Sequence, residues 1–136
     1  MTKLDEVIAH AYASQGKQED VNQVYLTLLR SSLFFPTKRE MLPNDDEPFR
    51  PLYASIDGRY FMLVFDTLER LTEWAGEQFL HMGYVELLGS DLIKGIGENV
   101  FLVLNQGVPF YKEFSPDEIK HLKKIVARTD QLRDIP

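Results

Sequence analysis

Two runs of apolar residues with helical spacing stand at the start of the sequence. The first occupies positions i, i+3, i+4, i+7 and i+8 with Leu4, Val7, Ile8, Ala11 and Tyr12. Side chains at this spacing share one face of a helix. We expect this helix to begin at Thr2 and to end at Gly16. A second helix is predicted from Asp20 to about Ser31, with Asp20 as its N-terminal cap and Gln23 completing a capping box.

A short strand and a long polar stretch come next. Residues 33–35 are apolar and include two phenylalanines, so we expect a strand that Pro36 ends. The stretch 37–51 is polar and interrupted by prolines, which predicts an exposed loop. Its acidic run at 44–47 lacks the alternating ligand spacing of a calcium loop and is predicted to be solvated.

The clearest local signal is a β-hairpin. Two strand-like runs, 52–56 and 59–65, flank the dipeptide Asp57-Gly58, which accepts the positive φ angles of a type I′ turn. The second run is apolar at almost every position, and a strand that is apolar on both faces is typical of the centre of a sheet. We therefore predict a central hairpin.

The rest of the chain alternates helices and strands. A helix is expected to start with a capping box of Asp66 and Glu69 and to end at Gly76, and the last helix has Ser115 as its cap and Pro116 in its first turn. A short helical turn is expected after residue 90. Further strands are predicted at 84–88, 100–104 and 108–114.

These elements together indicate the α+β class, with a single domain over residues 1–136 and a frayed tail at 129–136. We expect a mixed, mostly antiparallel sheet with the Asp-Gly hairpin at its centre and helices packed against it. The length of the chain agrees with a single domain, because 136 residues with 44% hydrophobic side chains are enough to bury one self-sufficient core.

Charge and composition exclude several classes of protein. The formal net charge is -6, the wrong sign for a field that attracts a phosphate backbone, so no nucleic-acid partner is expected. The sequence contains no cysteine, which rules out disulfides, thiol nucleophiles and cysteine-ligated metals. We find no signal peptide and no apolar run long enough to span a membrane, which predicts a soluble, cytoplasmic protein without membrane contact.

The patterns of chemically reactive residues are weak. Glu118 and His121 have the Glu-x-x-His spacing of a di-iron site, but a second such motif is missing. The stretch 94–99 contains two glycines but lacks the Gly-Lys-Ser/Thr ending of a phosphate-binding loop. We therefore predict no catalytic residue, no metal and no cofactor, and a protein that is not an enzyme.

Charged and aromatic residues suggest surfaces instead. The last predicted helix carries a basic stripe of Lys120, Lys124 and Arg128. Such a stripe is typical of the solvent-facing side of a helix, or of a site for an acidic protein partner. Aromatic side chains bury much area in interfaces at small entropic cost. Those near predicted turns or helix ends are candidates for an exposed patch: Trp74, Phe79, Tyr84, Phe110, Tyr111 and Phe114.

Three segments resemble one known family. They are residues 25–36 (YLTLLRSSLFFP), 61–74 (FMLVFDTLERLTEW) and 100–119 (VFLVLNQGVPFYKEFSPDEI). In this order they are similar to the N-terminal domain of the SseB family, named for enhanced serine sensitivity, with a core match over about 20–128. Family members often have Asn-Pro-Gly where this chain has Asn105-Gln106-Gly107, and longer members carry a C-terminal SseB domain that this sequence lacks. The resemblance implies a bacterial, soluble α+β domain without established catalytic residues or an assigned cofactor.

Two functions remain open. The first is a non-catalytic protein-interaction module that binds a protein partner or forms a homodimer, with contacts from Arg70, Trp74, Asn105, Gly107, Phe110 and Tyr111. The alternative is a small-molecule sensor or weak enzyme with a pocket formed at strand ends by Asp66, Arg70 and Asn105. In that pocket the Arg70 guanidinium would hold the carboxylate of an amino-acid-like ligand in a bidentate manner.

Overall fold

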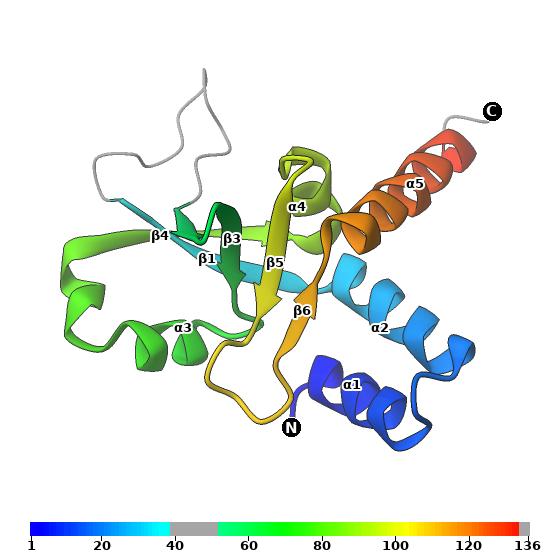
Figure 1. Ribbon diagram of the computed structural model, residues 1–136, viewed down its shortest axis with the longest axis horizontal. Helices are drawn as coiled ribbons and strands as arrows, with labels where there is room; N and C mark the ends of the chain where they lie inside the picture. Colours follow the sequence, from blue (N-terminus) through cyan, green and yellow to red (C-terminus); the bar gives the residue numbers. More distant parts are fainter. Residues whose placement is uncertain (39–51, 134–136) are drawn as a thin grey trace.

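The structure is a computed structural model that describes residues 1–38 and 52–133 (Figure 1). The predicted solvated run at 44–47 falls outside the described residues, whereas the last helix continues to Arg133, through most of the predicted frayed tail. In chain order the elements are α1 (Lys3–Ala13), α2 (Gln18–Arg30), β1 (Ser32–Lys38), β2 (Tyr53–Ile56), β3 (Arg59–Val64), α3 (Leu68–Ala75), the 3₁₀ helix η2 (Gly76–His81), β4 (Met82–Leu88), α4 (Gly89–Gly95), β5 (Val100–Leu104), β6 (Lys112–Phe114) and α5 (Pro116–Arg133).

Helix α1 begins at its predicted cap, whereas α2 does not. The Thr2 hydroxyl accepts a hydrogen bond from the Asp5 N–H at 3.2 Å, and the Asp5 carboxylate accepts one from the Thr2 N–H at 3.0 Å, which forms a capping box. α2 begins at Gln18, and among the described residues no side chain caps it. The predicted capping box of Asp20 and Gln23 is therefore wrong. Asp20 lies inside the first turn, where its negative charge interacts favourably with the positive end of the helix dipole.

Strand β1 continues through Pro36, so the prediction that this proline ends the strand is wrong. Phe34 and Phe65 exchange two main-chain hydrogen bonds of 2.8 Å on the side of β1 that faces away from β4. Pro36, two residues on, points its main chain to the same side, where its carbonyl oxygen accepts from the Leu52 N–H at 3.2 Å. The proline therefore removes no hydrogen bond between β1 and β4.

The larger sheet contains the predicted hairpin. Its strand order is β2-β3-β5-β6, with β3 and β5 parallel and the other neighbours antiparallel. Asp57 and Gly58 have φ angles of 52° and 77°, as a type I′ turn between β2 and β3 requires. β3 is an inner strand, as predicted, but β2 is an edge strand and all its residues are exposed. The hairpin therefore lies at the margin of the sheet and not at its centre.

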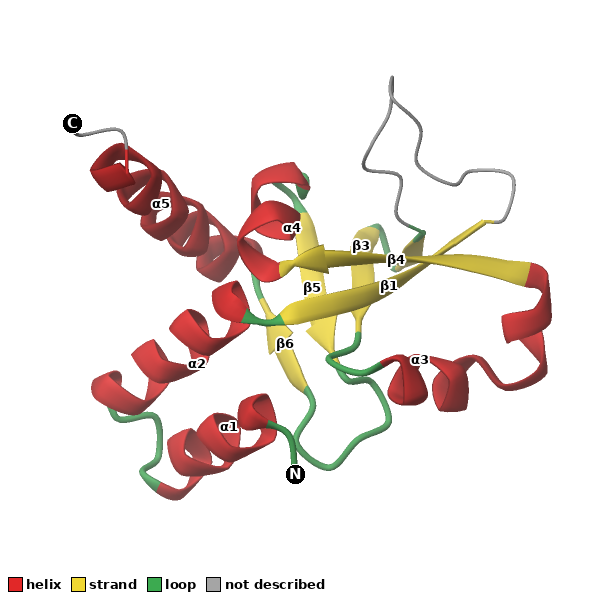
Figure 2. Ribbon diagram, turned by 180° about the vertical axis from the view of Figure 1, so that it is seen from behind, coloured by secondary structure: helices red, strands yellow, loops and turns green. Residues whose placement is uncertain are grey.

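The α+β class is confirmed, but the described strands form two sheets instead of one. β1 and β4 make a separate antiparallel ribbon that crosses one face of the larger sheet (Figure 2). The ribbon is joined to the larger sheet where Phe34 bonds to Phe65, directly after β3. Helices α1, α2 and α5 lie to one side of the two sheets, and α3 with η2 lies to the other (Figure 1).

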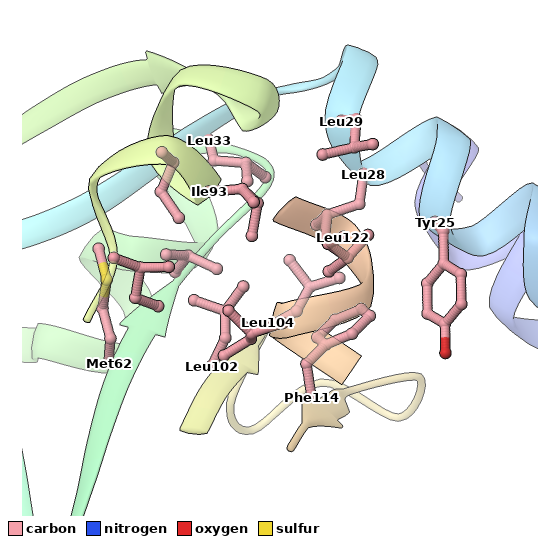
Figure 3. Close-up of a cluster of buried hydrophobic side chains, with 14 of the residues drawn as sticks. Tyr25, Leu28, Leu29, Leu33, Met62, Ile93, Leu102, Leu104, Phe114 and Leu122 are labelled. Carbon is pink, nitrogen blue, oxygen red and sulfur yellow. The ribbon is translucent and has the colours of Figure 1, made fainter. Parts of the chain in front are cut away.

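The core fills the space between the ribbon, the larger sheet and the helices. Along β3, Met62 and Val64 are fully buried while Phe61 and Leu63 are half-buried, so one face of the sheet meets the core. A Cβ atom on Gly89 would lie 1.9 Å from the Leu28 carbonyl oxygen, so only glycine fits where α4 begins against α2. Figure 3 shows the converging side chains, among them Leu28, Leu33, Ile93, Leu102, Leu104, Phe114 and Leu122.

Candidate functional site

Helix α3 carries two of the predicted site residues, Arg70 and Trp74, one turn apart. The Thr67 hydroxyl caps this helix by accepting a hydrogen bond from the Arg70 N–H at 3.1 Å. The predicted capping box of Asp66 and Glu69 is therefore wrong, because the neighbouring threonine takes that role. As a consequence the Asp66 carboxylate is free to bind another part of the molecule.

Three charged side chains, Asp5 of α1 and the neighbouring pair Asp66 and Arg70, meet beside the cap of α3. The Arg70 guanidinium binds Asp5 in a bidentate manner, with Nη2 2.6 Å from Oδ2 and Nη1 3.0 Å from Oδ1. Nη1 also lies 2.9 Å from Oδ1 of Asp66. The two carboxylate side chains are only 3% and 4% exposed. With Asn105, described below, we call Asp5, Asp66 and Arg70 the polar cluster.

The ion pairs in the polar cluster favour the charged forms. Burial on its own raises the pKa of Asp5, but the hydrogen bonds from Arg70 and Thr2 outweigh it and hold this pKa below the ordinary value. The hydrogen bond to Asp5 and the nearby Asp66 charge raise the pKa of Arg70, although burial alone would lower it. Both terminal nitrogens of the guanidinium are therefore already engaged by carboxylates of the protein itself.

Asn105 connects the polar cluster to the turn after β5. It is fully buried and has a φ angle of 59°, in the left-handed region that asparagine tolerates better than most residues. Its Oδ1 accepts a hydrogen bond from the Asp66 N–H at 3.1 Å, and its own N–H donates to the Val64 carbonyl oxygen at 2.8 Å. Its Nδ2 has no hydrogen-bond partner among the residues that the structure describes. Asn105 thus holds the ends of β3 and β5 together.

The structure brings Asp66, Arg70 and Asn105 together, as the small-molecule hypothesis required. The use that it makes of them is different. Arg70 was expected to offer its guanidinium to a ligand carboxylate, but the Asp5 carboxylate of α1 occupies that bidentate position. The role of Asp5 was missed from the sequence. A signal was present, because Asp5 lies three residues before Ile8 and so shares the buried side of α1.

Trp74, one turn after Arg70 on α3, belongs to a second feature, a group of half-exposed aromatic side chains. Its ring lies 5.6 Å from that of Phe65, beside β1. The Phe34 and Tyr84 rings are 6.2 Å apart across the ribbon, and the Phe79 ring of η2 stacks on Tyr84 at 6.1 Å. The Phe34, Phe79 and Tyr84 rings join η2 to the ribbon. Trp74 joins α3 to Phe65, whose main chain bonds to Phe34. We call Phe34, Trp74, Phe79, Leu80 and Tyr84 the aromatic patch.

Much of the aromatic patch is accessible to solvent. Trp74 is 40% exposed, Tyr84 41% and Leu80 72%. Trp74, Phe79 and Tyr84 were among the predicted surface aromatics, while Phe34 and Leu80 were not singled out. Leu80 could not be recognised from its spacing, because η2 is a 3₁₀ helix with no buried residue and therefore no apolar stripe to read.

The remaining predicted contact residues lie on the turn between β5 and β6. Tyr111 is 50% exposed, Gly107 is exposed with a φ angle of 89°, and Phe110 is half-buried against the core. Of the predicted contacts, Trp74, Gly107 and Tyr111 are thus on the surface. Asn105 belongs to the interior, and Arg70 is half-buried with its guanidinium bound by Asp5 and Asp66.

A groove of about 290 Å³ lies between α1, α2 and the start of α5. Apolar side chains of α1 and α2 line most of it, and an ion pair of Lys112 and Glu118, 3.2 Å apart, lies at its border. The Tyr25 hydroxyl donates to Glu118 at 2.9 Å. Burial and this carboxylate raise the pKa of Tyr25 to about 12. The charged groups of the groove are therefore engaged with each other.

The Glu-x-x-His spacing of α5 serves packing. Glu118 takes part in the ion pair with Lys112, and the His121 ring lies edge-on to Tyr25 at 5.6 Å. Within residues 1–38 and 52–133 no cluster of histidine and acidic side chains has an arrangement that could hold a metal ion. Over the same residues, every helix is too short or too polar to cross a lipid bilayer.

Comparison with known proteins gives one match. The model of the family described as the SseB protein N-terminal domain matches residues 4–121. No curated protein and no solved structure matches the chain significantly.

Proposed function

The chain belongs to the SseB protein N-terminal domain family, and from this premise we propose that it is a non-catalytic protein-interaction module whose contact surface is the aromatic patch. The observation that carries the proposal is that Trp74, Leu80 and Tyr84 are exposed and that the half-buried rings of Phe34 and Phe79 contact Tyr84. Tryptophan and tyrosine are enriched among the residues that dominate binding energy at protein interfaces.

The polar side chains support the same proposal because they do not form an open ligand-binding site. A ligand-binding or acid–base site needs polar groups that are free to meet a substrate. The Arg70 guanidinium, the Asp5 carboxylate and the Lys112–Glu118 pair are instead bound to one another. The large apolar side chains on the surface, by contrast, are available to a partner.

Affinity capture from cells that produce the protein tests this proposal. We expect Trp74→Ala and Tyr84→Ala each to lower the yield of the captured partner by about tenfold or more, because truncating an interface hot spot costs at least that much affinity. Tyr12→Ala is the matched control, since Tyr12 is a 62% exposed aromatic residue on α1. Circular dichroism verifies that all three variants fold. Equal capture by all three would refute the proposal.

A further inference from the structure

Strand β4 has a free edge. Its neighbour is β1, and in the part of the chain that the structure describes no strand pairs with its other side. Main-chain groups of an antiparallel strand point to alternate sides. The main-chain N–H and C=O groups of Phe34 point to Phe65, away from β4. Those of Phe35, the next residue of β1, therefore point to its partner Val85 on β4. On β4 itself, the main-chain groups of Tyr84 and Glu86 point outward, away from β1.

Only a few main-chain N–H and C=O groups of β4 point outward from this edge. The Met82 N–H donates to the Phe79 carbonyl oxygen at the end of η2. The N–H and C=O groups of Tyr84 and Glu86 lie between that end of the strand and α4, where they can pair with another strand. Glu86 is the charged residue in the sequence MGYVELL of β4. The side chains of Tyr84 and Leu88 are exposed on the same face.

Resting on the proposed function, we infer that the partner is a second copy of this chain, which pairs its β4 with this β4 in antiparallel orientation about a two-fold axis at Val85. An edge strand paired with itself in this way is self-complementary, because each donor of one copy meets an acceptor of the other. The two ribbons then form one continuous sheet with the order β1-β4-β4-β1.

The charge of Glu86 selects the register. With the axis at Val85, Tyr84 and Glu86 of one copy stand opposite Glu86 and Tyr84 of the other, and each pair exchanges both main-chain hydrogen bonds. The phenol hydroxyl lies beside a carboxylate in that arrangement. A shift that puts the axis at Glu86 places two carboxylates directly opposite, which is destabilising. A shift to Tyr84 leaves the Glu86 main chain opposite Met82, whose N–H is already used.

The same register joins the two aromatic patches. Cross-strand neighbours in a sheet project to the same face, so Tyr84 and Leu88 of both copies lie on one side of the combined sheet. Phe34, which is tilted against Tyr84 across the ribbon, lies on that side as well. The two aromatic patches thereby adjoin on one face of the combined sheet, and Tyr84 is the patch residue at the contact between the copies.

Sedimentation equilibrium at concentrations up to about 100 µM measures this association. We expect a reversible dimer at about 0.15 M salt, where the repulsion between two copies of net charge -6 is screened. Glu86→Pro is expected to abolish it. Proline at this outward position removes no hydrogen bond to β1, in the same way that Pro36 removes none to β4.

A charge exchange tests the register and provides its own control. Tyr84→Glu and Tyr84→Lys both lose the aromatic ring, but only the first places a carboxylate opposite Glu86 of the second copy. We expect the dimer dissociation constant of Tyr84→Glu to exceed that of Tyr84→Lys by about tenfold, because the contact occurs twice. Adding Glu86→Lys to Tyr84→Glu should restore association.

The possible results separate the inference from the proposed function. A monomer at every concentration, or a dimer in which the Tyr84→Glu and Tyr84→Lys variants associate equally, overturns the inference. The proposed function then stands or falls on the capture experiment with Trp74→Ala. A foreign protein captured by a monomeric chain would likewise retain the interaction module and reject the second copy as its partner.

Discussion

Arg70 and Trp74 lie one turn apart on α3 and have opposite environments. Arg70 reaches into the interior, where its guanidinium joins α1 to the start of α3 through Asp5 and Asp66. Trp74 packs against Phe65 with the rings tilted and leaves 40% of its surface in solvent. Both residue types are enriched in interfaces, so their chemistry alone does not separate them. The difference is decided by what the rest of the chain places next to each side chain.

The comparison separates residues with a structural role from residues with a binding role. Charged groups that could bind a ligand are used to hold distant segments together, because a buried carboxylate is stable only with a partner. Aromatic rings are left at the surface of a small helix and a two-stranded ribbon. We therefore expect the polar cluster to control the free energy of unfolding and the aromatic patch to control binding.

The largest effect is expected for Arg70→Met. The variant leaves two carboxylates buried without a cation, and we expect the free energy of unfolding to fall by about 3 kcal/mol. Urea denaturation followed by circular dichroism measures the loss. Arg30→Met is the matched control, because Arg30 is exposed on α2, and it should change stability by less than about 0.5 kcal/mol. Similar losses in the two variants would show that the polar cluster has no special structural role.

Asn105 permits a finer test of the same cluster. We expect Asn105→Ala to lower the free energy of unfolding by about 2 kcal/mol, since it loses the hydrogen bond to the Asp66 N–H and places a Cβ-bearing residue without a polar side chain at a φ of 59°. Asn105→Gly loses the same hydrogen bond but relieves the backbone, so it should be more stable than Asn105→Ala by about 1 kcal/mol. Equal losses would mean that the backbone angle is unimportant.

Acid should weaken the polar cluster by a smaller amount. The pKa of Asp5 is lower in the folded protein than its ordinary value of 3.8. Its ion pair therefore contributes fully above pH 3.8 and is lost as the pH falls through the lower folded value. The free energy of unfolding of the wild type should thus decline more steeply below pH 3.8 than that of Asp5→Asn. Parallel pH profiles would contradict the assignment of Asp5 to this ion pair.

The smallest effect on stability is expected for Trp74, one turn further along α3. Trp74→Ala removes a ring that is partly in solvent, and we expect a loss of about 1 kcal/mol. Leu71, on the same helix, is fully buried, and Leu71→Ala should cost about 3 kcal/mol. Thermal or urea unfolding of the two variants measures the loss in free energy of unfolding for each. A loss for Trp74→Ala as large as that for Leu71→Ala would place Trp74 in the core and remove it from the contact surface.

Local sequence signals located those parts of the fold that depend on neighbouring residues. The Thr2 cap and the Asp57-Gly58 turn were predicted because the groups that satisfy them lie within a few residues. Pro36 was misread because its effect depends on which side of β1 carries β4. That information is tertiary, since β4 begins at Met82.

The candidate site could be predicted only in part for the same reason. Arg70, Asp66 and Asn105 were expected to meet, and they do. The partner that occupies Arg70 is 65 residues away in sequence. The place of Asp5 on the buried side of α1 indicates that it needs a partner, but no local pattern identifies Arg70 as that partner. Trp74 and Tyr84 were recognised as candidates for the surface from their place near turns, but their connection through Phe34 and Phe65 arises from the ribbon.

One measurement compares Arg70 and Trp74 of α3 directly. Affinity capture with the wild type, Arg70→Lys and Trp74→Ala, each verified as folded, separates structural from binding roles, because lysine keeps the charge but cannot form the bidentate pair with Asp5. We expect Arg70→Lys to unfold more easily yet to capture its partner as the wild type does, and Trp74→Ala to remain stable yet lose the partner. Capture lost in Arg70→Lys and kept in Trp74→Ala would contradict this division of roles.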